Sequence, residues 1–276
     1  MTGPVVVGFD GSPESLAATS WAAREAERRD CPLHLLQAWP RPKRGAPEQH
    51  RPLEQLLARE AELRTTVTVP VSSSQVPDAP AEALDEAART AALLVLGSRG
   101  LGALRGFLVG SVSQEVLRRA ACPVVLVRTG EDEPAGPVLV GIDLTHPMDE
   151  VLAFAFEAAA RRSAPLRVVH VWSPPVGSEY MAFDAIGGLQ EELSAAERTS
   201  FTELLEPWRA RRPAVDVTAD LVRGSPTVAL VDAAATARLL VLGRRVRRTL
   251  LGAHLGPVAH AAVHHVHCPV ALVPHA

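Results

Sequence analysis

Two copies of one pattern make up this 276-residue sequence. An internal repeat constrains the architecture first, because each copy must form one structural unit of the same kind. Four apolar segments recur in the same order, the first two 133 residues apart and the last two 146 residues apart: 5–10 and 138–143, 33–39 and 166–172, 93–97 and 239–243, 122–124 and 268–270. The second copy is therefore expected to be longer between its second and third strands.

Within each copy, strand-like apolar runs alternate with helix-like segments, which is typical of a parallel α/β sheet. An acidic stretch with Gly and Pro separates the copies, so we predict a first domain at 1–130, a linker at 131–136 and a second domain at 137–276. The expected elements of the first copy are a strand ending near Asp10, helices over 13–29, up to 63 and over 80–89, and strands over 33–39, 66–71, 91–96 and 124–127.

Composition narrows the class of protein. The chain is 47% hydrophobic and 21% charged, with a formal net charge of −3, which predicts a packed core and gives no electrostatic field for nucleic acid. Lys43 is the only lysine, and it is remote from every glycine-rich segment, so a Walker-type phosphate loop is excluded. With no basic and apolar leader and no apolar run of membrane-spanning length, we expect a cytoplasmic protein that does not bind membranes.

The three cysteines do not form a disulfide framework. Each is followed by Pro at the start of an apolar run, which indicates buried and unreactive thiols: Cys31, Cys122 and Cys268. This supports the reducing interior of the cell as the compartment.

A glycine-spaced segment follows the apolar run 91–96 and precedes a helix-like segment that starts near Val112. In that context, backbone N–H groups and the positive end of a helix can hold phosphate. Gly97 and Gly100 can adopt left-handed backbone angles and leave room for a ligand, and Ser111 can offer a hydroxyl group as well as its amide. Ordinary turn glycines are the alternative interpretation of each glycine taken singly.

The pattern Gly97-x2-Gly100-x9-Gly110-Ser111, with Asp10 at the end of the first strand, resembles the nucleotide-binding signature of the universal stress protein family. The resemblance covers the whole chain and implies a tandem member. It implies two tandem Rossmann-like α/β domains, each a five-stranded parallel sheet flanked by helices in the strand order 3-2-1-4-5. It also implies an ATP-binding stress-response or signalling protein that is not an enzyme.

The same resemblance implies ATP in the first domain, with Mg²⁺ as a candidate companion. Asp10 would accept hydrogen bonds near the ribose, and Ser111 would contribute its hydroxyl group to the phosphates. The full set of implied binding residues is Gly8, Asp10, Ala38, Leu96, Gly97, Gly100, Gly110, Ser111 and Val112. Arg99 and Arg105 are either phosphate-screening residues or solvated loop arginines.

The second copy departs from this pattern. Val246 replaces the second glycine, and Pro257 replaces the serine of the Gly-Ser pair. Proline lacks both an N–H group and a hydroxyl group, so two donors are lost from the phosphate site. We therefore expect the second site to bind ATP much more weakly or not at all, although four arginines make its loop basic enough for another anion: Arg244, Arg245, Arg247 and Arg248.

Other functions also fit this sequence. A slow ATPase, a nucleotide-independent interaction module, and a binder of another adenine nucleotide such as cAMP all fit parts of the pattern.

His260 and His264 lie one helical turn apart, a spacing that can chelate a metal ion. The repeat places the polar residues Gln114 and Arg118 at the equivalent positions of the first copy, so we predict an exposed helix face and no metal site. The family resemblance implies an intrachain pseudo-dimer through strands 124–127 and 270–273, with a homodimer of chains left open and the protein partner unknown.

Overall fold

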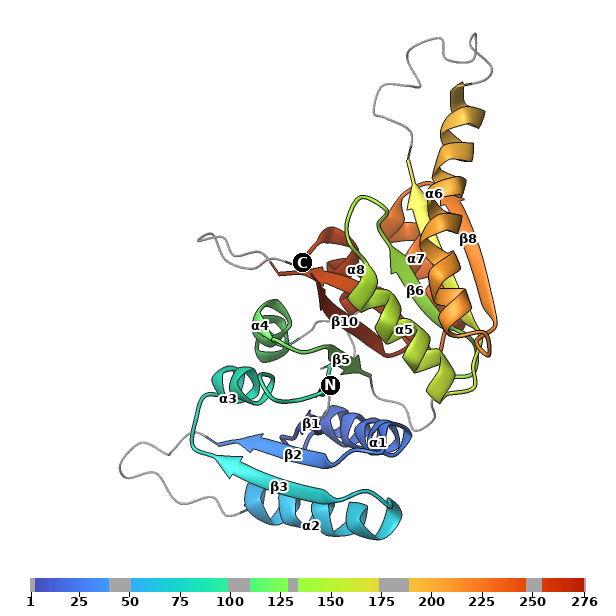
Figure 1. The fold of residues 1–276 in the computed structure, drawn as a ribbon. Coiled ribbons are helices and arrows are strands. Elements are labelled where there is room, and N and C mark those ends of the chain that lie inside the picture. Colours follow the sequence, from blue (N-terminus) through green and yellow to red (C-terminus); the bar gives the residue numbers. More distant parts are fainter. Residues whose placement is uncertain are drawn as a thin grey trace.

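The computed structural model describes residues 3–39, 51–98, 110–128, 134–173, 189–246 and 255–275. The strands are β1 (Val5–Gly8), β2 (Leu33–Ala38), β3 (Val71–Val76), β4 (Leu93–Gly97), β5 (Val124–Val127), β6 (Val138–Ile142), β7 (Leu166–Trp172), β8 (Val217–Arg223), β9 (Leu239–Arg245) and β10 (Val270–His275). The helices are α1 (Pro13–Arg29), α2 (Arg51–Thr66), α3 (Pro80–Ala87), α4 (Ser111–Arg119), α5 (Asp149–Arg161), α6 (Leu189–Arg211), α7 (Pro226–Ala233), a short 3₁₀ turn (Ala234–Thr236) and α8 (Pro257–His265) (Figure 1).

All these strands belong to one ten-stranded sheet with the order β3-β2-β1-β4-β5-β10-β9-β6-β7-β8. Each half contributes five parallel strands in the order 3-2-1-4-5, which confirms the expected fold. The halves join where β5 and β10 pair antiparallel, with Val125 opposite Ala271. The pairing of the last strands is thus confirmed, and it makes the two half-sheets continuous.

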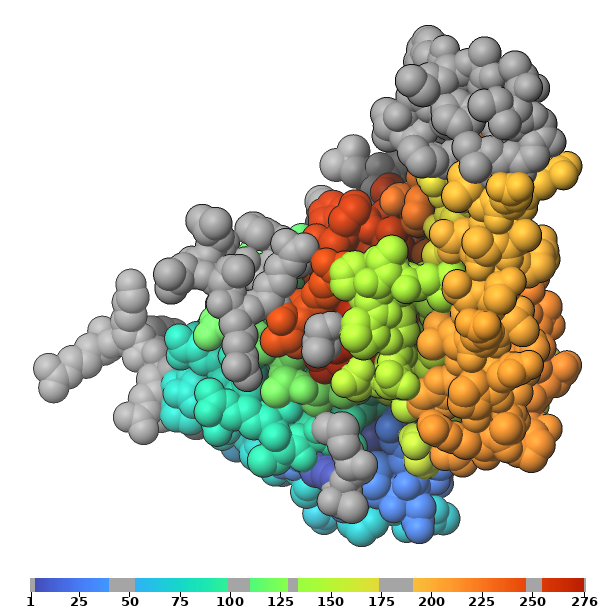
Figure 2. Space-filling model, turned by 45° about the horizontal axis from the view of Figure 1, so that its top comes forward, coloured from blue at the N-terminus to red at the C-terminus, as the bar shows by residue number. Residues whose placement is uncertain are grey.

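The sheet is covered by helices on both faces. Helices α1, α2, α5 and α6 pack on one face, while α3, α4, α7 and α8 pack on the other. Alternate residues of one strand point to opposite cores, as Val5 and Val6 of β1 do. Because both faces are buried, the central strands read as continuous apolar runs. In Figure 2 the C-terminal segment, in red, lies between the cyan part of the N-terminal half and the golden to orange atoms of the segment that includes α6 and β8.

Helix α1 has the start and stop signals that its sequence indicates. The Ser12 hydroxyl group accepts a hydrogen bond of 3.2 Å from the backbone N–H of Ser15, and Pro13 occupies the first turn. Glu14 lies in the same turn, where an acidic side chain complements the positive end of the helix. Asp30 ends the helix in the left-handed region, at φ 49°. The helix bounds match the expected 13–29.

The third strand was predicted at the wrong place. We expected it over 66–71, but α2 continues to Thr66 and β3 covers Val71–Val76. Strand β3 lies at the edge of the sheet, and only its first residue, Val71, is buried. Its sequence is therefore polar and lacks the continuous apolar run that predicts the central strands.

Among the helices that the structure describes, none is long and apolar enough to cross a membrane.

Candidate functional site

A cavity of about 290 Å³ opens at the carboxyl ends of β1 and β4. Strand order reverses between these two strands, because β1 leads outward to β2 while β4 leads to β5. Open α/β sheets bind ligands at such a switch point, in the crevice outside the strand ends. The cavity is lined by Gly8, Phe9, Asp10, Ser12, Glu14, Ser15, Leu36, Ala38, Pro80, Leu84, Leu96, Gly97, Gly110, Ser111, Val112 and Ser113.

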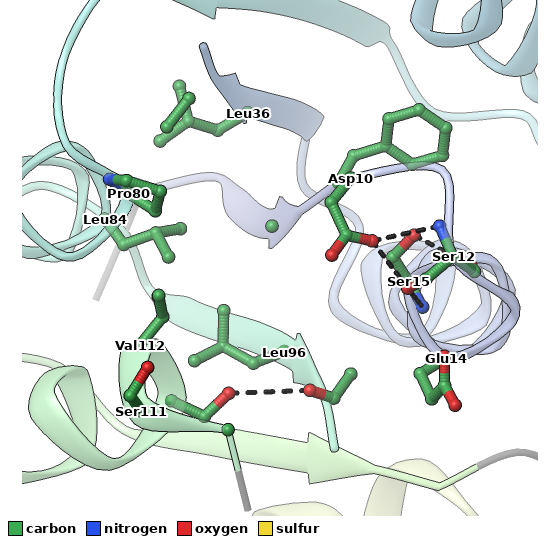
Figure 3. A pocket seen from close by; sticks show the side chains of 16 residues that line it. Asp10, Ser12, Glu14, Ser15, Leu36, Pro80, Leu84, Leu96, Ser111 and Val112 are labelled. Atoms are coloured by element: carbon green, nitrogen blue, oxygen red, sulfur yellow. Dashed lines mark hydrogen bonds between the residues drawn. The ribbon is translucent and has the colours of Figure 1, made fainter. Parts of the chain in front are cut away.

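The Asp10 carboxylate is held in place by the turn that follows β1. Its Oδ1 accepts hydrogen bonds from the backbone N–H of Ser12, at 3.0 Å, and from the Ser12 hydroxyl group, at 2.5 Å. Ser12 in turn caps α1, so the carboxylate is tied to the start of that helix (Figure 3). Gly11 makes this turn with φ +80°, an angle that side chains beyond glycine rarely adopt. An acidic side chain is thereby fixed at the cavity wall.

The first turn of α4 faces the same cavity from the other side. The first helical N–H to find an acceptor four residues back is that of Gln114, which bonds the Gly110 carbonyl at 3.0 Å. The N–H groups of Ser111, Val112 and Ser113 precede it, and no side chain among the described residues caps this end. The Ser113 hydroxyl group donates to the Gly97 carbonyl at 3.5 Å and links the helix start to β4 (Figure 3). This helix end can receive an anion.

Gly97 lines the cavity but does not adopt the left-handed backbone angle suggested for it. Among the described glycines, Gly11, Gly136 and Gly224 have positive φ, whereas Gly97 is extended in β4. A Cβ atom on Gly97 would lie 2.7 Å from the backbone C and O atoms of Glu14. The glycine is required because the start of α1 passes directly over β4. That close approach also brings Glu14 and Ser15 into the cavity wall.

Eight of the nine residues expected at the site line this cavity, although they come from segments as far apart as β1 and α4. The ninth, Gly100, lies outside the described residues, as do Arg99 and Arg105. Sequence reasoning missed the apolar wall formed by Leu36, Pro80 and Leu84, and the polar wall of Ser12, Glu14 and Ser15. The Asp-Gly-Ser-Pro run was a usable signal for the polar wall, because it is typical of an Asx turn followed by a helix N-cap.

The second half has a counterpart cavity of about 600 Å³ at the ends of β6 and β9. Asp143, the equivalent of Asp10, accepts hydrogen bonds from the backbone N–H and hydroxyl group of Thr145, at 3.0 and 2.6 Å. Its second oxygen lies 2.9 Å from His146 Nδ1, and Arg245 approaches it at 3.9 Å. Burial raises the pKa of this carboxyl group, but the hydrogen bonds from Thr145 and His146 outweigh burial and leave the pKa below its usual value.

The helix that borders the second cavity begins differently. Pro257 occupies the first position of α8, where Ser111 begins α4. Proline is well tolerated at that position, but it removes one N–H group and the hydroxyl group. The two cavities therefore share an aspartate at the strand end and differ where phosphate would bind.

The late histidines lie on an accessible helix surface. His260 is exposed, and its ring centroid lies 4.5 Å from that of His264. Within the described ranges, no three His, Cys, Asp or Glu side chains gather closely enough to hold a metal ion.

The model of the universal stress protein family matches this chain twice, over residues 1–128 and 135–274. Universal stress protein Rv2005c of Mycobacterium tuberculosis is 37% identical over 286 residues, which span 96% of this chain and 95% of that protein. A universal stress protein of Archaeoglobus fulgidus shares the fold with a TM-score of 0.72 and 18% identity, covering 99% of both chains. PA1789 of Pseudomonas aeruginosa has a TM-score of 0.74 at 21% identity, covering 99% of this chain and 92% of that one.

Two successive matches to one family model and a relative similar along its whole length show that this chain belongs to the universal stress protein family as a tandem, two-domain member.

Proposed function

We propose that the first half binds ATP in the cavity at the ends of β1 and β4. The observation that carries this proposal is the convergence of a fixed carboxylate, Asp10, and an open helix start, Ser111–Ser113, on one cavity at the switch point of the sheet. A volume of about 290 Å³ is close to the lower end of the range of roughly 300–1,000 Å³ for ligand pockets. The chemistry of the wall suits a ligand with an apolar ring at one end and negative charge at the other.

The apolar wall is the proposed base site. Leu36 and Ala38 come from β2, and Pro80 and Leu84 come from α3. Figure 3 shows Leu36, Pro80 and Leu84 on the side of the cavity away from Glu14. Aliphatic side chains of this kind can hold a flat purine, and Asp10 next to them can accept hydrogen bonds from ribose hydroxyl groups.

The start of α4 is the proposed phosphate site. Three backbone N–H groups without intrahelical acceptors and the exposed Ser111 side chain face the cavity, and the helix dipole favours negative charge there. Asp10 and Glu14 add two carboxylates to the lining of the same cavity. Because a divalent cation offsets the repulsion between carboxylates and phosphates, we expect Mg²⁺ to accompany the nucleotide.

We further propose that ATP acts on this protein as a regulatory ligand in a stress response. Binding would tie together β1, α1 and α4, which are separate parts of the first half, and so would change their contacts with partners.

Turnover of ATP is the competing function. Release of inorganic phosphate from Mg·ATP by the wild-type protein, lost in the Asp10→Ala variant, would establish the ATPase in its place.

A pair of reciprocal substitutions tests the nucleotide site. Ser111→Pro gives α4 the residue that begins α8, at a helix position where proline is tolerated. We expect it to keep the fold, as judged by circular dichroism, and to weaken ATP binding in calorimetry by about tenfold or more, since a charge-assisted hydrogen bond contributes roughly 1.5–3 kcal/mol. Pro257→Ser is the matched control and should leave ATP binding in the first half unchanged. Unaltered affinity in Ser111→Pro would contradict the proposed phosphate site.

A further inference from the structure

An arginine of the second half holds the far end of the helix that borders the first cavity. Arg244, near the end of β9, is 5% exposed. Its guanidinium group donates a hydrogen bond of 3.1 Å to the backbone carbonyl of Arg118 and another to the carbonyl of Ala120. Helix α4 ends at Arg119, so these carbonyls belong to its last turn and the residue that follows. Such carbonyls lack intrahelical partners and carry the negative end of the helix dipole, which a cation stabilises.

A second arginine, from the first half, makes the corresponding contact with the end of a helix in the second half. Arg128, directly after β5, donates to the carbonyls of Val263, at 2.8 Å, and Val266 in the last turn of α8 and just beyond it. The two helices are equivalent in the repeat, since Ala120 and Val266 lie 146 residues apart. The arginines are not equivalent: the same offset pairs Arg244 with Ser98 and Arg128 with Pro274. Each half therefore supplies a cap to the other half from a different place in its sequence.

Of these two arginines, only Arg244 binds a helix that borders the first cavity. Helix α4 borders that cavity with Ser111, Val112 and Ser113, at the opposite end from the Arg244 contact. At nine residues, it is a rod of about 13 Å, so a shift at one end is transmitted to the other. Arg244 also lines the second cavity, so one side chain contacts both the second cavity and the helix that borders the first. Arg128 instead holds α8, whose first turn borders only the second cavity.

We propose that Arg244 is a positioning residue for the first site and couples it to the second half of the chain. It fixes the C-terminal end of α4, and thereby sets the place of the N–H groups of Ser111–Ser113 that face the first cavity. A ligand or partner that moves Arg244 in the second cavity changes the affinity of the first site. This inference rests on the proposed nucleotide site, although the positioning itself can be measured without nucleotide.

Calorimetry with Mg·ATP on the full-length chain tests the coupling. Arg244→Met keeps the side-chain stem and removes the hydrogen-bond donors, and we expect the affinity to fall about fivefold or more, as is typical of coupling between sites. Arg128→Met is the matched control, because it removes the equivalent cap from α8, and it should leave the affinity unchanged. Equal weakening in both variants would mean general loosening between the halves and would overturn the proposal. If Arg244→Met does not fold, Arg244→Lys keeps the charge with a single donor group and should give an intermediate loss.

Hydrogen exchange without nucleotide separates this proposal from the proposed function. We expect Arg244→Met to speed amide exchange in α4 and not in α8, and Arg128→Met to do the reverse. If the wild-type chain binds no ATP but this double dissociation holds, the proposed function fails while the positioning role stands. If exchange in α4 is the same in Arg244→Met as in the wild type, the positioning role is wrong whatever the nucleotide affinity.

Discussion

Arg162 of the second half lies 2.5 Å from Glu25 of the first, measured from Nη2 to Oε2, and both side chains are almost fully buried, at 0% and 1% exposed. Glu25 also receives a hydrogen bond of 2.6 Å from Arg29 through its other oxygen. Arg29 and Arg162 are equivalent in the repeat, 133 residues apart. One carboxylate therefore serves two equivalent arginines, one from each half.

Each of these two arginines also lies over an aromatic ring of the other half, and the two rings are equivalent in the repeat. The guanidinium carbon of Arg162 lies 5.6 Å from the ring centroid of Trp21, and that of Arg29 lies 5.3 Å from the ring centroid of Phe154. This interface between α1 and α5 is close to two-fold symmetric. The exception is the carboxylate itself, because Ala158 stands at the position equivalent to Glu25.

Removing this carboxylate should strongly destabilise the pairing of the halves. Glu25→Ala removes the carboxylate that pairs with the buried Arg162 and the mostly buried Arg29, and breaking a buried ion pair costs about 3–5 kcal/mol. We expect a loss of that order in the free energy of unfolding, measured by urea denaturation followed by circular dichroism.

The symmetry of the interface supplies the control. In Glu25→Ala/Ala158→Glu the carboxylate moves to the equivalent residue, where Arg29 and Arg162 can both reach it. We expect this double variant to regain most of the lost stability, whereas Ala158→Glu alone buries a second carboxylate and destabilises the chain. If the loss of stability in the double variant equals or exceeds the sum of the losses in the two single variants, the shared-carboxylate interpretation is refuted.

The close approach of β4 to α1 makes Gly97 sensitive to a single methyl group. Gly97→Ala would place its Cβ 2.7 Å from backbone atoms of Glu14, which cannot rotate away, so we expect a loss of about 1–3 kcal/mol in urea unfolding. In Gly8→Ala the nearest atom is the end of the Leu96 side chain, at 2.9 Å, which can shift. The Gly97 variant should therefore be the less stable of the two, and the reverse order would contradict the packing described.

The buried thiols should resist alkylation in the native protein. Burial raises the pKa of Cys122 to about 11 and that of Cys268 to about 12, so both stay protonated at pH 8. Cys31 is only half-buried, and burial also raises its thiol pKa. We expect iodoacetamide followed by peptide mass spectrometry to find Cys31 modified first, and the other two modified only in denaturant. Rapid native labelling of Cys122 or Cys268 would show that these strand starts open readily.

The charge of Asp10 can be tested without disturbing its turn. In Asp10→Asn the amide oxygen can still accept the two hydrogen bonds from Ser12, but the negative charge is gone. We expect ATP affinity to fall about tenfold, because hydrogen bonds to charged groups contribute roughly 1.5–3 kcal/mol. Asp143→Asn is the matched change in the second half. If it weakens ATP binding as much as Asp10→Asn does, the nucleotide has been assigned to the wrong half.

Most of the fold could be predicted because its signals are local or repeated. The doubled pattern fixed the number of domains, and buried parallel strands such as β4 and β5 are apolar throughout. Strand β3 could not be placed, since an edge strand with a polar sequence carries no such run. The pairing of β5 with β10 followed from the family resemblance, because nothing local in either strand specifies an antiparallel partner.

The site was predictable only where the chain signals it locally. Asp10 and Ser111 stand next to strand ends and helix starts, and the structure brings them to one cavity. Leu36, Pro80 and Glu14 reach the same cavity through the packing of distant elements, which no short motif records. The Arg244 contact to α4 joins residues more than a hundred positions apart and belongs to the tertiary structure alone.

The stoichiometry of nucleotide binding tests the central proposal most directly. Isothermal titration of Mg·ATP into the purified full-length chain should give one strong site per chain, because Ser111 begins α4 with its donors intact and Pro257 removes two donors from the start of α8. Two equivalent sites, or no binding at all, would contradict an ATP site confined to the first half.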